Sequence, residues 1–104
     1  MNYGKEIHNQ LMHNRVVVWS WGAHAYKTFT ENDFPEYGIH RGGLIFKVQG
    51  AKFKGHVMIV LTAADLYDVY FGHLRKGVFY KKLSSHLGIY CDQLHELIDT
   101  TVET

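Results

Sequence analysis

The stretch from Asp65 to Gly77, DLYDVYFGHLRKG, gathers two aspartates, two tyrosines, a histidine and two basic residues. Acid–base catalysis needs a proton carrier, and nucleophilic catalysis needs a nucleophile beside a base and an orienting group. A plainer interpretation is a strand, in which the side chains of Asp68 and Tyr70 point to one face and those of Val69 and Phe71 to the other. Asp65, after two alanines, is typical of a turn in which a carboxylate accepts backbone N–H bonds. We therefore predict no catalytic residue here.

Cys91 and His95 stand four residues apart on a predicted helix and could share one face of a metal site. Zinc sites usually have four ligands in recognisable spacing, and no CxxC or HxxxH accompanies this pair. The same pair has no evident orienting acid for nucleophilic catalysis, so Cys91 is better explained as a small buried residue. We predict a protein that is not an enzyme, with no metal and no cofactor.

Histidines are frequent, and they are spread almost evenly along the chain without a repeated metal-binding spacing. Their default place is at strand and turn ends, while convergence of several of them in three dimensions stays open. The eight are His8, His13, His24, His40, His56, His73, His86 and His95.

Charge is divided unevenly although the net charge is only +1. Residues 41–82 carry eight basic side chains against Asp65 and Asp68, whereas four acids lie in the last 13 residues. A basic middle could attract a polyanion or a complementary protein surface, or simply keep the protein soluble.

Two function classes follow from these residues. The first is a non-enzymatic interaction module, with a homodimer as one form, in which Trp19, Trp21 and Tyr70 are the exposed aromatic candidates; at least one tryptophan is equally expected in the core. The alternative is a nucleic-acid-binding protein that uses a basic, aromatic sheet surface. The basic candidates are Lys47, Lys52, Lys54, Arg75, Lys81 and Lys82.

The elements that must position these residues follow from hydrophobic periodicity. Tyr3, Ile7 and Leu11 predict an amphipathic helix over residues 3–13, and RVVVWSW, residues 15–21, predicts a first strand. Residues 22–43 predict turns and a loop, with a short strand near residues 26–29. Residues 44–50, 56–62, 66–75 and 78–85 predict further strands, the last two joined by a hairpin turn at Lys76-Gly77.

A second amphipathic helix is predicted after Ile89, with Tyr90, Leu94, Leu97 and Ile98 on its apolar stripe. Short connections between strands favour an antiparallel arrangement. We predict one α+β domain over residues 1–104: an antiparallel meander of four or five strands with the N- and C-terminal helices packed on one face. A sheet covered on one side leaves surface for a homodimer at micromolar concentration.

The runs GAHAYKTF, LIFKVQG, VMIVLTAADLYDVYF and IYCDQLHELID resemble a set of small uncharacterised proteins carried by bacterial phages, plasmids and conjugative elements. His24 stands where those proteins have a lysine or arginine. The resemblance implies an accessory protein of a mobile genetic element and brings no functional residue with it. A polar amino-terminal segment and a single cysteine favour a cytoplasmic protein without membrane association.

Overall fold

A computed structural model describes residues 3–33, 40–75 and 78–102, apart from the side chains of residues 14, 74, 75, 78–83 and 91. The helical elements at the amino end are α1 (Tyr3–Leu11), the 3₁₀ turn η1 (Met12–Asn14) and α2 (Arg15–Ser20). The strands are β1 (His24–Thr30), β2 (His40–Gln49), β3 (Lys54–Thr62), β4 (Tyr67–Arg75) and β5 (Val78–Ile89). The 3₁₀ turn η3 (Cys91–Gln93) and helix α3 (Leu94–Val102) complete the described chain.

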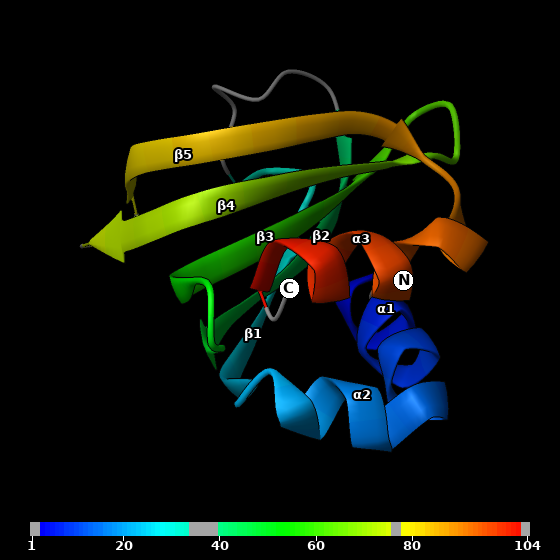
Figure 1. Ribbon diagram of the computed structural model, residues 1–104. Helices are drawn as coiled ribbons and strands as arrows, with labels where there is room; N and C mark the ends of the chain where they lie inside the picture. Colours follow the sequence, from blue (N-terminus) through cyan, green and yellow to red (C-terminus); the bar gives the residue numbers. More distant parts are fainter. Residues whose placement is uncertain (1–2, 34–39, 76–77, 103–104) are drawn as a thin grey trace.

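The strands form one sheet in the order β1-β2-β3-β4-β5, and every neighbouring pair is antiparallel. The predicted α+β meander is therefore confirmed, with β3 at its centre. Helices α1, α2 and α3 gather on one side of the sheet, which twists above them (Figure 1). Among the described residues, no helix is long and apolar enough to cross a membrane.

The face of the sheet toward the helices holds the main core. Alternate residues of the central strands point into it, as a period of two requires. Helix residues fill the other side at spacings of three and four, which match one helical stripe. The strand members are Leu44, Phe46, Val48, Val57, Ile59, Leu61, Val69 and Phe71, and the helical layer adds Ile7, Leu11, Val18, Trp21, Leu94, Ile98 and Val102.

Two polar ties fasten the helical layer across long sequence separations. The indole N–H of Trp21 donates to Asp99 Oδ1 at 3.0 Å. The Nε2 atom of His95 donates to the carbonyl oxygen of Leu11 at 2.8 Å, because a carbonyl can only accept. These bonds satisfy polar groups that would otherwise be costly to leave beside the core.

A second, smaller cluster lies on the outer face of the sheet, away from the helices. It consists of residues that alternate with the main-core positions of the same strands, and its members are Phe29, Ile45, Met58, Val60 and Tyr70. The ring of His40, which is also buried, packs edge-on against Phe29 at a centroid distance of 5.7 Å. The outer face is therefore apolar and buried over part of its length.

Residues 15–20 form helix α2, so the predicted first strand at residues 15–21 is wrong. Valine and tryptophan favour strands, but tertiary packing decides here. The 3₁₀ turn η1 carries the helical path of α1 onward, and Val18 and Trp21 then enter the core three residues apart. Val16 and Trp19 face outward at 75% and 66% exposure.

Other boundaries shift by a few residues. Strand β1 is longer than predicted, and β2 already begins at His40. Because β5 continues to Ile89, the final helix starts at Leu94 and leaves Tyr90 exposed rather than on the apolar stripe. The predicted hairpin turn at Lys76-Gly77 lies outside the described residues.

Helix α1 packs directly on the sheet at Gly4, which lies against the backbone of β2. A Cβ at Gly4 would collide with the carbonyl oxygen of Gly43 in β2 and would come within 2.8 Å of Thr28 Cγ2 in β1. Glycine at position 4 therefore sets the distance between α1 and the sheet.

Candidate functional site

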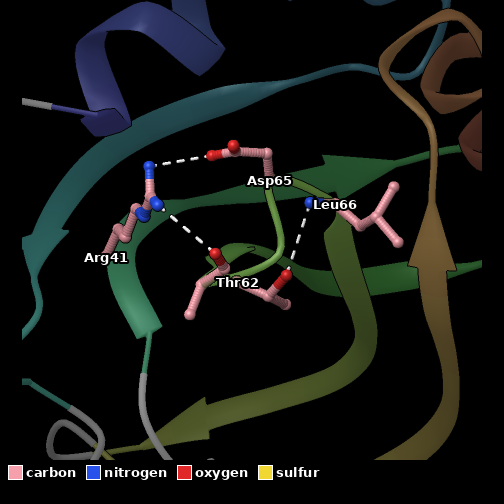
Figure 2. Close-up of polar contacts among 5 residues, drawn as sticks. Arg41, Thr62, Asp65 and Leu66 are labelled. Carbon is pink, nitrogen blue, oxygen red and sulfur yellow. Dashed lines mark hydrogen bonds and ion pairs between the residues drawn. The ribbon is translucent and has the colours of Figure 1, made fainter.

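The aspartates of DLYDVYF have structural partners. Asp65 ends a turn in which its N–H donates to Thr62 O at 3.1 Å, and its φ of 63° is a left-handed value that aspartate tolerates. Its carboxylate pairs with Arg41 Nη1 at 2.8 Å, and Arg41 Nη2 also donates to Ala63 O (Figure 2). The predicted turn is confirmed, but the carboxylate of Asp65 pairs with Arg41, and Thr62 Oγ1 instead accepts a hydrogen bond from the backbone N–H of Leu66 at 3.3 Å.

Asp68 of β4 accepts a hydrogen bond from the backbone near the end of strand β5. Its Oδ1 accepts a hydrogen bond from the backbone N–H of Gly88 at 3.0 Å, where Gly88 has a φ of 68°. This bond lies where the register between β4 and β5 shifts, between Tyr67 and Val69. A carboxylate that satisfies the backbone of an irregular strand needs no catalytic role to explain it.

Of the Cys91–His95 pair, the structure describes only the side chain of His95, because the side chain of Cys91 lies outside the described residues. His95 uses Nε2 to bind the Leu11 carbonyl. Within the described part of the chain, no group of three or more histidine, cysteine, aspartate or glutamate side chains could hold a metal ion.

The three aromatic residues predicted to form a partner surface do not lie on one common surface. Trp19 is exposed as predicted, but Trp21 is fully buried in the helix-covered core and Tyr70 is 6% exposed in the outer cluster. The expectation of exposure is wrong for both, because Trp21 follows Val18 by one helical turn and Tyr70 packs in a row with Ile45 and Met58. Trp21 instead bears out the alternative that one tryptophan belongs to the core.

Basic side chains gather on the outer face, beside the apolar cluster. The backbone register pairs His24 with Lys47, Lys47 with His56, and His56 with Gly72, so one row crosses four strands. A bulge between His24 and Lys27, where Ala25 has a φ of 56°, returns His24 to the face of Lys47. The structure thus brings together histidines far apart in sequence.

These residues line a groove of about 360 Å³, which we call the basic groove. Lys54 joins it from the start of β3, opposite Gln49 in the register, and His73 joins it from β4. No carboxylate belongs to the described lining. Its residues are His24, Lys47, Val48, Gln49, Lys54, Gly55, His56 and His73.

The electrostatics of the basic groove disfavour a charge on its central histidine. Partial burial lowers the pKa of His56 from the ordinary value of 6.5, and the positive charges of Lys47, His73 and His24 lower it further. His24 Nδ1 lies 2.7 Å from the carbonyl oxygen of Gly22, so that nitrogen carries the proton.

The predicted basic set is only partly assembled. Lys47 and Lys54 lie in the basic groove, whereas Lys52 is exposed on the β2–β3 connection, where its N–H donates to Val102 O at 2.8 Å. The side chains of Arg75, Lys81 and Lys82 lie outside the described residues. The backbone register nevertheless places Lys82 opposite Gly72, at the end of the same row.

Sequence reasoning missed the three histidines of the groove. Alternation along β2 and β3 could have placed Lys47 and His56 on the outer face, but the strand register and the bulge at Ala25 are not visible as a sequence pattern. No protein-family model, curated protein or solved structure matches this chain.

Proposed function

We propose that this protein is a non-enzymatic binding module whose basic groove takes a single-stranded nucleic acid. One observation carries the proposal: two lysines and three histidines from four adjacent strands line one groove without a carboxylate among its described residues. Lysines neutralise phosphates and release their counterions, which supplies most of the affinity for a polyanion.

Histidines favour a single strand over a duplex. An imidazole ring offers a face on which an unstacked base can lie, whereas the bases of a duplex are already stacked on one another. His24 is exposed and His56 half-buried, so both rings border the groove next to Lys47. A duplex would engage the lysines alone and bind more weakly.

The test is fluorescence anisotropy with a labelled oligothymidylate of about 15 nucleotides, titrated at several salt concentrations. The double variant Lys47→Ala/Lys54→Ala should reduce the slope of log affinity against log salt by about one to two. The matched control, Lys5→Ala/Arg15→Ala, removes the same charge from exposed helix positions and should leave the slope unchanged. Equal losses in both variants, or no binding by the natural protein, would refute the proposal.

A protein-interaction role, with a homodimer as its simplest form, is the second candidate. The exposed pair Val16 and Trp19, three residues apart on α2, supports it. Light scattering tests it: a dimer at micromolar concentration that Trp19→Ser dissociates supports the role, and a 12.0 kDa monomer throughout contradicts the dimer. A place in a mobile genetic element and a cytoplasmic location are proposals that rest on the sequence alone.

A further inference from the structure

We propose that nucleic-acid binding in the basic groove is coupled to proton uptake by His56, so that affinity rises as the pH falls below neutrality. This inference rests on the proposed function and adds its regulation. Three strands contribute to it with their side chains, since β1, β2 and β3 place His24, Lys47, Lys54 and His56 on the groove.

Three positive or titratable groups of neighbouring strands act on the charge of His56. Lys47 is its register partner on β2, and Lys54 precedes it by two residues on its own strand. His73 of β4 and His24 of β1 complete the set. A proton added to His56 in the free protein therefore joins existing positive charges.

A bound phosphodiester reverses this situation. The free protein holds the pKa of His56 below its ordinary value through burial and the neighbouring cations. A phosphate close to Lys47 and Lys54 offsets their charges and adds an opposite charge near the imidazole, which favours the protonated ring. The complex thus binds more protons than the free protein does.

Linkage fixes the sign and bounds the size of the effect. If the complex binds more protons than the free protein, the dissociation constant falls as the pH falls. When the pKa of one histidine is higher by about one in the complex than in the free protein, affinity changes by at most about tenfold. For a single histidine with that difference, we expect about fivefold tighter binding near pH 5.5 than near pH 7.5, because this range does not extend far beyond both pKa values.

The experiment measures anisotropy of the same oligothymidylate from about pH 7.5 to about pH 5.5 at constant ionic strength. The natural protein is compared with His56→Gln and with His13→Gln, a control at an exposed histidine of the helical layer. A further variant, His56→Lys, supplies a charge that does not titrate in this range. Circular dichroism at each pH verifies that every variant is folded.

We expect the pH dependence to be retained in His13→Gln, largely lost in His56→Gln, and reduced in His56→Lys with tight binding at both ends of the range. Should His56→Gln not fold, His56→Lys alone decides the matter. Binding that is independent of pH, or equally dependent in all variants, overturns this inference and leaves the proposed function standing. Absence of binding at every pH overturns the proposed function itself.

Discussion

Two halves of the outer sheet face share the same strands and have opposite character. Strand β2 contributes Ile45 to the apolar half and Lys47 to the basic groove, and β3 contributes Met58 and His56 in the same way. In each strand the two residues are two positions apart, which is about 7 Å along the chain. Ile45 is 3% exposed and Met58 fully buried, while Lys47 is open to solvent.

The contrast shows what alternation controls and what it leaves open. A period of two decides the face on which a side chain lies, and it places all four of these residues on the outer face. It does not decide whether that part of the face is covered. Burial on the outer face therefore changes between two residues that are two positions apart in the same strand. The residue types change from apolar to basic at the same point.

The largest effect should come from moving a charge across this boundary. Met58→Lys places an ammonium group at a fully buried position without an opposite charge, and should destabilise the protein by more than about 4 kcal/mol. The converse, Lys47→Met, should change stability by about 0.5 kcal/mol or less while weakening the binding of nucleic acid. Urea unfolding compares the two, and similar losses would show that the halves do not differ.

The helix-covered face provides the next test. Leu94 is fully buried between α3 and the sheet, so Leu94→Ala should lower the free energy of unfolding by about 2 to 5 kcal/mol. Glu96→Ala, on the exposed side of the same helix, serves as the control and should cost less than about 1 kcal/mol. An unchanged melting temperature in Leu94→Ala would mean that α3 does not dock as described.

The ion pair at the turn before β4 should contribute little. Arg41 and Asp65 have side chains that are 40% and 70% exposed, and exposed pairs typically contribute at most about 1 kcal/mol. Asp65→Asn keeps a residue that tolerates the left-handed backbone, so its cost should stay below that value in thermal unfolding. A larger loss would assign the turn a role beyond this pair.

The smallest expected effect is the dependence of stability on pH at the basic groove. The pKa of His56 is lower in the folded protein than in the unfolded chain, so the unfolded chain binds more protons as the pH drops below about 6.5. That difference lowers stability toward acid. His56→Gln should make the urea midpoint less sensitive to pH over this window, and an unaltered sensitivity would contradict it.

Sequence patterns predicted the sheet better than the helices. The alternation of Leu44, Phe46 and Val48, and that of Val69 and Phe71, is strong enough to fix the strands and their core-facing sides. The strand prediction at residues 15–21 is wrong because it relied on the strand preference of β-branched residues. Packing of Val18 into the core overrides that preference.

The candidate site was accessible only in part. Lys47 and Lys54 were recognisable as basic residues, but their convergence with His24 depends on strand register and on one bulged residue, Ala25. Tyr70 shows the reverse difficulty, because its face was predicted but its burial was not. Whether other parts of the chain bury a given part of a sheet face depends on the tertiary structure. A short sequence pattern does not encode it.

The two polar ties of the helical layer bear on how fast the chain folds and unfolds. Each strand pairs with the strand before it, so the meander closes short loops, whereas the Trp21–Asp99 and His95–Leu11 bonds join residues 78 and 84 positions apart. Long loops are slower to close. We therefore expect loss of either tie to accelerate unfolding much more than it slows folding, so that these bonds extend the lifetime of the folded protein.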